Sequence, residues 1–188
     1  DYGTAFDEAH RMIVAENPQV TTPFYWRNFL KIKNQFLGGI KDPFDEHPGS
    51  AGILIFFRWF LLHNIIENDL LNKYDFFVIT RSDFIYTLPH PSLNVLSDDC
   101  IYIPSGEGYG GVTDRHVVLP KKFVVPYLDM LNKMITHGEE YYRKMSSYRD
   151  WNLEQFIKFH LEENGVWNRV RFFPYIMYSI RSEGGTTR

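Results

Sequence analysis

The chain has 188 residues, with 20 Lys and Arg against 23 Asp and Glu, and its formal net charge is −3. This length fits one domain better than two, and it is sufficient to bury a core without disulfides. Proteins that bind nucleic acids or anionic membranes in a general way usually carry a basic excess. The composition therefore argues against both of these classes, and we expect no nucleic-acid partner.

The cysteine content and the apolar stretches bear on the compartment. Cys100 is the single cysteine, so no internal disulfide can form, which fits a reducing compartment such as the cytoplasm. The most apolar stretch, 51–66, is interrupted by Arg58 and His63 and is too short to span a bilayer. We expect it to be a core helix, with no stable membrane insertion. The abrupt start at Asp1 favours one module of a longer chain.

Five segments are predicted to be helical from apolar spacing, breakers and cap residues. They are 3–16, 24–37, 51–72, 121–145 and 152–164. Ser50 is expected to cap the third of these helices. The apolar face of the last one is formed by Leu153, Phe156, Ile157 and Leu161.

The predicted strands begin at residue 75, after the first three predicted helices. Residues 75–80 form a continuous apolar run, which is typical of a strand buried on both faces. Residues 100–104 and 116–120 are further short strands, and 169–181 is strand-like on both sides of Pro174. This order of helices and strands predicts an α/β layered domain over 1–188. In such folds ligands bind outside the carboxyl ends of strands.

A first cluster of polar residues, Thr80-Arg81-Ser82-Asp83, directly follows the apolar strand 75–80. A carboxylate at this place can bind Mg²⁺ or Mn²⁺, with phosphate and water oxygens as the remaining ligands. An arginine can bind phosphate through its planar fork. Two structural alternatives stay open, namely an Arg–Asp pair at a strand end and an aspartate that caps a turn.

A second cluster, "PSGEGYGGVTDRH", covers 104–116 and combines four glycines with Glu107, Tyr109, Asp114 and Arg115. Glycine lets a backbone approach a ligand closely. The stretch matches neither the phosphate-binding loop that ends in Lys-Ser/Thr nor a complete Gly-x-Gly-x-x-Gly. The alternative is a flexible hairpin with solvated charges.

These two clusters carry a resemblance to a known family. "YDFFVITRSDFIY" (74–86) resembles the strand and metal-site segment of GT-A glycosyltransferases, and "GYGGVTDR" (108–115) resembles the acceptor-side loop of inverting galactosyltransferases. From residue 51 onward, the chain resembles the small glycosyltransferase domain encoded by large chlorella viruses. The resemblance implies a GT-A-like single domain, with a mixed central sheet flanked by helices. Such an enzyme moves a hexose or deoxyhexose from a UDP-sugar to a glycan acceptor.

The resemblance also implies roles for individual residues. Asp83 matches the last carboxylate of the family's Asp-x-Asp motif and would contact Mn²⁺ or Mg²⁺, with Ser82 beside it. Arg81 stands where the first aspartate usually stands, which is a departure from the family pattern and removes its usual contact. The family often has a further metal ligand near its last strand, and we assign none.

On the acceptor side, the resemblance makes Asp114 the catalytic carboxylate. Gly110 and Gly111 match the glycine pair of the family's loop. Arg115 or Arg181 would add positive charge near the phosphates. If Asp114 accepts the proton of the attacking hydroxyl, the reaction inverts the anomeric configuration. If Asp114 only holds sugar hydroxyls, a retaining outcome stays open.

Other readings of the sequence also stay open. A non-catalytic carbohydrate-binding module would use the aromatic residues as sugar platforms, and a sugar-nucleotide nucleotidyltransferase would share the fold class. If the viral resemblance holds, the acceptor is a capsid glycoprotein glycan and the compartment is the host cytoplasm. The seven histidines are scattered without a zinc-binding spacing. Asp150 or Asn152 is expected to cap a helix, and acceptor contact by Asp150, Asn152 or Glu154 is the alternative.

Overall fold

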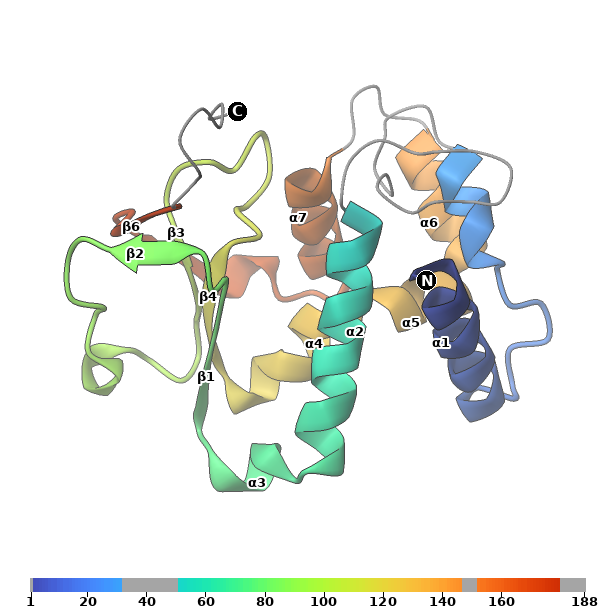
Figure 1. The fold of residues 1–188 in the computed structure, drawn as a ribbon, viewed down its shortest axis with the longest axis horizontal. Coiled ribbons are helices and arrows are strands. Elements are labelled where there is room, and N and C mark those ends of the chain that lie inside the picture. The colour runs from blue at the N-terminus through green and yellow to red at the C-terminus, as the bar shows by residue number, and fades with distance from the viewer. Residues whose placement is uncertain (1, 32–50, 147–151, 180–188) are drawn as a thin grey trace.

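The structure is a computed structural model that describes residues 2–31, 51–146 and 152–179 (Figure 1). Its α-helices are α1 (Tyr2–Glu16), α2 (Ala51–Glu67), α3 (Leu70–Lys73), α4 (Val124–Leu128), α5 (Met130–Thr136), α6 (Gly138–Ser146) and α7 (Leu153–Glu163). Its strands are β1 (Phe76–Thr80), β2 (Phe84–Tyr86), β3 (Ile101–Pro104), β4 (His116–Pro120), β5 (Val170–Phe173) and β6 (Met177–Ser179). Short 3₁₀ turns occur at Trp26–Lys31, Leu93–Val95, Lys121–Phe123 and Trp167–Arg169.

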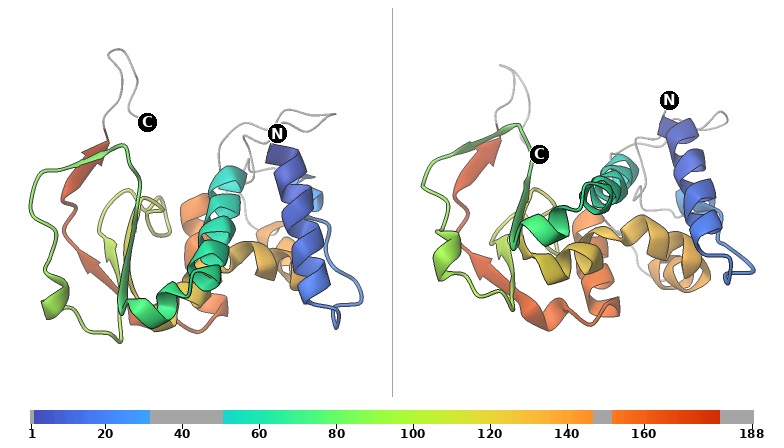
Figure 2. Two further views of the ribbon diagram at one scale, coloured as in Figure 1. Left: turned by 60° about the horizontal axis from the view of Figure 1, so that its bottom comes forward. Right: turned by 90° about the horizontal axis from the view of Figure 1, so that it is seen from below.

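The chain is mixed α/β, and its main sheet is itself mixed. Four strands lie in the order β1-β4-β3-β5, in which β4 runs antiparallel to both neighbours and β3 runs parallel to β5. A separate antiparallel pair joins β2 to β6. The helices gather on one side of the four-stranded sheet, and the β2–β6 pair lies on the other side (Figures 1 and 2). The expected mixed sheet with helices is confirmed, whereas the GT-A fold itself stays a prediction.

The core lies where α2 packs against α4 and α5 and where α7 packs against α4. The start and the buried face of helix α7 follow from residues within and next to the helix. Asn152 caps it by accepting a hydrogen bond from the Gln155 amide at 2.8 Å. Its predicted apolar face is confirmed, because the four side chains of that face are all buried: Leu153, Phe156, Ile157 and Leu161.

Two predicted long helices are interrupted in the structure. The helix predicted over 51–72 breaks after Glu67, because Asp69 adopts a left-handed conformation with φ 54° before α3 begins. The helix predicted over 121–145 is divided at Asp129 and His137 into α4, α5 and α6. Asp129 accepts a side-chain hydrogen bond from Asn132, a local polar contact that competes with a continuous helix.

The helix predicted over 24–37 is only a 3₁₀ turn within the described residues, at Trp26–Lys31. The remainder of that prediction and the predicted cap at Ser50 lie outside the described residues. None of the helices in the described ranges is long and apolar enough to cross a bilayer.

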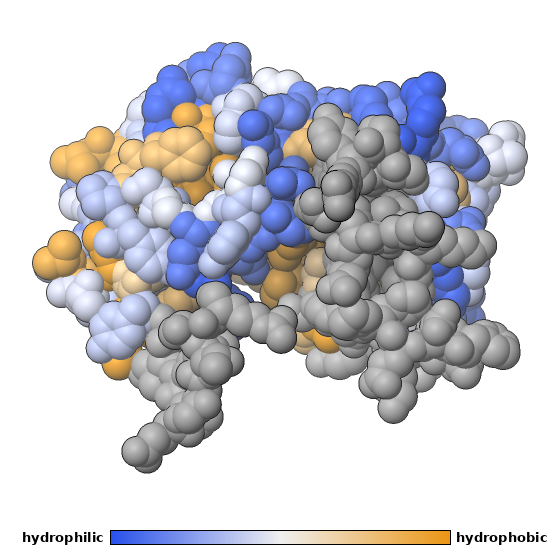
Figure 3. All heavy atoms as spheres, turned by 90° about the horizontal axis from the view of Figure 1, so that it is seen from above, coloured by the Kyte–Doolittle hydropathy of each residue, from blue (hydrophilic) through white to orange (hydrophobic). Residues whose placement is uncertain are grey.

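The prediction that the apolar run 75–80 is buried on both faces is wrong. β1 is an edge strand of the sheet, none of its residues is fully buried, and Val78 is 44% exposed. The fully buried strand is β4, which lies between β1 and β3. Large apolar side chains reach the surface at the end of the molecule that holds the strands (Figure 3), and those of the strands include Val78, Ile85, Phe172 and Tyr178.

Candidate functional site

The strand register brings the two polar clusters to one edge of the main sheet. Thr80, the last residue of β1, pairs with His116, the first residue of β4. Arg81 and Arg115 are therefore neighbours across the two strands. The carboxyl ends of β3 and β5 meet at the same edge, because Pro104 pairs with Phe173. We call this place the sheet-edge site.

Arg81 and Asp83 form a bidentate ion pair at this edge. Arg81 Nε donates to Asp83 Oδ1 at 2.9 Å, and Arg81 Nη2 donates to Asp83 Oδ2 at 2.7 Å. These hydrogen bonds lower the pKa of Asp83, and the positive charge of Arg115 lowers it further. Both side chains are about two-fifths exposed, at 43% and 39%. The predicted structural alternative, an Arg–Asp pair at a strand end, is thus present, and Ser82 lies exposed in the turn between its two members.

Arg115 is held by a second carboxylate, that of Glu107. The two form an ion pair, and Tyr175 Oη donates a hydrogen bond of 3.0 Å to the same carboxylate oxygen. Burial raises the pKa of Tyr175, and the negative charge of Asp114 acts in the same direction. Tyr175 follows β5, so a third segment of the chain contributes to the site.

Asp114 lies near enough to these groups to act on them by its charge. Its charge raises the pKa of Arg81, although the direct hydrogen bond to Asp83 is the larger cause. Its main-chain oxygen accepts a hydrogen bond of 2.8 Å from Arg58, whose side chain is buried at 6% exposure. The Arg58 guanidinium also lies over the Tyr127 ring, with its central carbon 5.2 Å from the ring centre. Arg58 therefore anchors the loop from inside the protein.

The glycines of the loop are required by packing against α7. A Cβ atom on Gly111 would lie 1.9 Å from the Glu154 carbonyl oxygen, and the adjacent Val112 amide donates to that oxygen at 3.1 Å. Gly110 has φ +90°, and a Cβ there would meet the Gln155 side chain at 2.8 Å. These contacts account for the glycine pair without a ligand, so a role in ligand binding stays a prediction.

The same loop holds two non-glycine residues in the left-handed region, Glu107 with φ 48° and Tyr109 with φ 41°. Such conformations are unfavourable and persist only where the surroundings fix them. The Tyr109 carbonyl accepts hydrogen bonds from Asn152 at 3.0 Å and from Gln155 at 3.4 Å. These contacts from the start of α7 hold the loop while the Tyr109 side chain remains 53% exposed.

Glu154 contributes a further carboxyl group near the sheet-edge site. It lies in the first turn of α7, and burial raises the pKa of its carboxyl group, with the charge of Asp114 as a further cause. The sequence offered a helix cap or acceptor contact for this part of the chain, and the cap is Asn152. The proximity of Glu154 to Asp114 depends on how the loop packs on α7, and residue spacing does not reveal it.

Two histidines in contact with each other, His116 and His90, lie next to the sheet-edge site. His116 is 1% exposed, its Nδ1 lies 3.0 Å from Tyr86 Oη, and its Nε2 lies 3.2 Å from Nε2 of His90. His90 Nδ1 faces the Pro91 carbonyl, which can only accept, so His90 accepts from His116 and His116 accepts from Tyr86. Burial and the neighbouring His90 lower the pKa of His116 to about 4.

The described residues do not fit a metal site built by the protein. Both oxygens of Asp83 already accept hydrogen bonds from Arg81. Within residues 2–31, 51–146 and 152–179, no group of three or more His, Cys, Asp or Glu side chains could hold a metal ion together. Positive charge at the sheet-edge site comes from arginine side chains instead. Arg181, which was predicted to lie near phosphate, is outside the described residues.

Comparison with known proteins yields no relative of this chain. No protein-family model matches it, and neither a curated protein nor a solved structure is detectably similar. The geometry of the sheet-edge site and the sequence resemblance are therefore the guides to function.

Proposed function

We propose that the chain is a glycosyltransferase that moves a hexose or deoxyhexose from a UDP-sugar to a glycan acceptor. The observation that carries the proposal is the meeting of Arg81, Arg115 and Asp114 at one edge of the sheet, where β1 ends and β4 begins. Two planar cations and one carboxylate are a suitable set for a leaving diphosphate and an attacking hydroxyl.

In this proposal the arginines bind the diphosphate of the donor. Each guanidinium is held in place by a carboxylate, Arg81 by Asp83 and Arg115 by Glu107, so its orientation is fixed before the ligand arrives. Arginine can bind phosphate oxygens through two parallel hydrogen bonds. Fixed positive charge near the bond to the leaving group stabilises the negative charge that develops there.

Asp114 is the proposed general base. It would accept the proton of the acceptor hydroxyl while the hydroxyl oxygen attacks the anomeric carbon and the diphosphate departs. The hydrogen bond from Arg58 to the Asp114 carbonyl fixes the backbone of this residue, which supports a role that needs precise placement. A base that acts in this way gives inversion of configuration.

The Mn²⁺ or Mg²⁺ ion that the resemblance implies stays a prediction, and no step of the proposal depends on it. One titration of UDP with and without Mn²⁺ distinguishes a metal-dependent donor site from a donor site based on arginine. A metal-dependent donor site predicts a gain in UDP affinity with Mn²⁺ that Asp83→Ala removes. A site based on arginine predicts similar UDP affinity with and without the ion.

The proposal is tested by incubating the protein with a panel of UDP-, GDP- and TDP-sugars and following donor hydrolysis by proton NMR. We expect turnover of one UDP-sugar with inversion, and a loss of at least about a hundredfold in rate for Asp114→Asn. UDP binding should survive that substitution, because Asp114 is assigned to the acceptor side. A protein that binds free sugars but neither binds UDP nor turns over any donor would be a carbohydrate-binding module, and the proposal would be wrong.

A further inference from the structure

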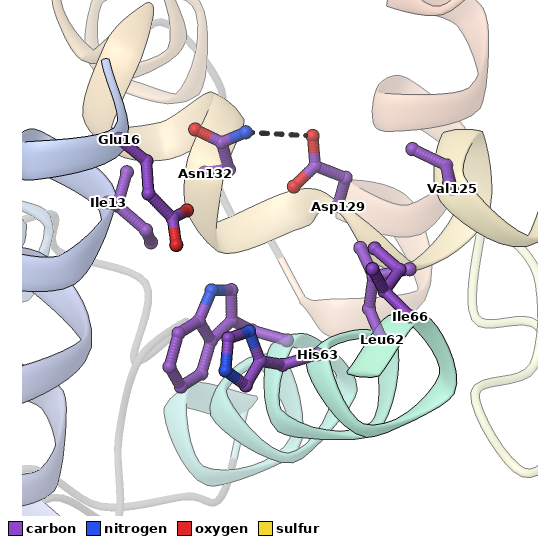
Figure 4. A pocket seen from close by; sticks show the side chains of 9 residues that line it. Ile13, Glu16, Leu62, His63, Ile66, Val125, Asp129 and Asn132 are labelled. Atoms are coloured by element: carbon purple, nitrogen blue, oxygen red, sulfur yellow. Dashed lines mark hydrogen bonds between the residues drawn. The ribbon is translucent and has the colours of Figure 1, made fainter. Parts of the chain in front are cut away.

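A second hollow, unrelated to the sheet-edge site, lies among the helices. It is a pocket of about 190 Å³ between the end of α1, the second half of α2 and the junction of α4 with α5 (Figure 4). Its polar lining consists of Glu16, Asp129, Asn132 and His63, and its apolar lining consists of Ile13, Trp59, Leu62, Ile66 and Val125. We call it the helical pocket.

Two carboxylates face this pocket from different helices. Glu16 comes from α1 and Asp129 from the α4–α5 junction, and both side chains point toward the hollow in Figure 4. Asn132 donates a hydrogen bond of 3.0 Å to Asp129, but within the described part of the chain neither carboxylate forms an ion pair. Lys133 acts on Asp129 only as a more distant charge. Among the described residues, the pocket therefore has two carboxylates that form no ion pair.

An aromatic wall completes the pocket on the α2 side. The rings of Trp59 and His63 are stacked, with centres 5.5 Å apart and planes 16° apart. His63 also lies 3.1 Å from Glu67, which is not part of the lining. The face of an indole ring attracts cations more strongly than the other aromatic side chains do.

The negative charge of Asp129 is unfavourable for folding at this place. Burial raises the pKa of Asp129 to about 6, and the charge of Glu16 acts in the same direction, whereas Asn132 and Lys133 offset part of the effect. Proteins keep such destabilising groups mainly where function requires them. The missing element is a positive charge inside the pocket.

We propose that the helical pocket binds a small organic ammonium ion whose body is apolar. The ammonium group would lie between Glu16 and Asp129, and the apolar body would lie against Trp59 and Leu62. The volume fits such a molecule, because a cavity of about 150 Å³ already accepts benzene. A bare divalent cation fits less well, since no group of three metal-ligating side chains occurs among the described residues.

Benzylamine is a suitable probe, and benzyl alcohol is its neutral match in shape. Titration calorimetry should show benzylamine binding at least about tenfold more tightly than benzyl alcohol, because charge-assisted hydrogen bonds form only with the amine. Asp129→Asn should remove this preference. Asp75→Asn, which changes an exposed carboxylate paired with Lys121 elsewhere in the protein, should leave it unchanged.

Three results would overturn the proposal: equal affinity for the amine and the alcohol, unchanged amine affinity in Asp129→Asn, or displacement of benzylamine by millimolar Ca²⁺ or Mg²⁺. Trp59→Leu gives an independent readout, because it keeps both carboxylates. We expect it to weaken benzylamine binding about fivefold through loss of the contact between the ring of benzylamine and the indole. Thermal unfolding of each variant shows whether it is folded before it is titrated.

Discussion

The sheet-edge site and the helical pocket differ in whether their charged side chains have partners of opposite charge. At the sheet edge, Arg81 and Arg115 each have a carboxylate partner, and the groups are partly exposed. In the helical pocket, Glu16 and Asp129 have no cationic partner among the described residues, and burial disfavours the charge on Asp129. The carboxylates at the sheet edge hold the arginines in place for an anion, whereas the helical pocket gains stability when a cation binds.

The loop of the sheet-edge site gives the largest expected effect. Gly111→Ala places a methyl group 1.9 Å from the Glu154 carbonyl oxygen, so either the loop or α7 must move. We expect a loss of about 3 kcal/mol in the free energy of unfolding, measured by urea denaturation.

Gly106→Ala is the matched control in the same loop. A Cβ there meets nothing within 4 Å, and only its φ of +97° opposes the substitution. We expect a loss of about 1 kcal/mol. Equal losses for the two variants would show that the loop does not pack on α7 as described.

Acid should change the stability contributions of the two regions in opposite directions, and it should destabilise the sheet edge. The pKa of His116 is lowered from 6.5 to about 4 in the folded chain. Its contribution to stability is therefore complete above pH 6.5 and is lost as pH falls toward 4. The loss is on the order of 3 kcal/mol and is measured as unfolding free energy against pH. His116→Gln should flatten this part of the profile, and an unchanged profile would contradict the buried neutral state.

In the helical pocket, stability should fall as pH rises. The pKa of Asp129 is raised from 3.8 to about 6, so its ionisation destabilises the folded chain as pH rises through 6. Asp129→Asn should therefore raise the free energy of unfolding by about 3 kcal/mol at pH 7, and by well under about 1 kcal/mol at pH 4. Denaturant titrations at the two pH values check this difference. A destabilised variant at pH 7 would mean that the carboxylate has a cationic partner.

The smallest expected effect on stability belongs to the ion pair at the sheet edge. Arg81 and Asp83 are both partly exposed, so Arg81→Gln should change the free energy of unfolding by less than about 1 kcal/mol. A thermal melt measures the change. A much larger loss would make the pair a structural element of the fold and would weaken its assignment to ligand binding.

The sequence predicted the elements better than their arrangement. Apolar spacing and the Asn152 cap identified α7 and its buried face correctly, because these signals are local. The same kind of signal misplaced the buried strand, because an apolar run reports hydrophobicity and not the position of a strand in the sheet. β1 has such a run and yet lies at the edge.

The candidate site was predicted in part. Arg81, Asp83, Asp114 and Arg115 were singled out by their places beside strands, and the pairing of Thr80 with His116 brings their segments together. The contributions of Glu107 and Tyr175 depend on an ion pair and a hydrogen bond between distant segments. The helical pocket had no local signal, since its lining comes from α1, α2 and the α4–α5 junction.

Calorimetry with UDP is the most direct test of the sheet-edge site as a diphosphate site. The matched control is Lys121→Gln, because Lys121 forms an exposed ion pair with Asp75 at the opposite end of β1 and β4. We expect wild-type and Lys121→Gln proteins to bind UDP equally, and Arg81→Gln to bind it at least about tenfold more weakly. Failure of the wild-type protein to bind UDP, or equal binding by all three proteins, would contradict the account.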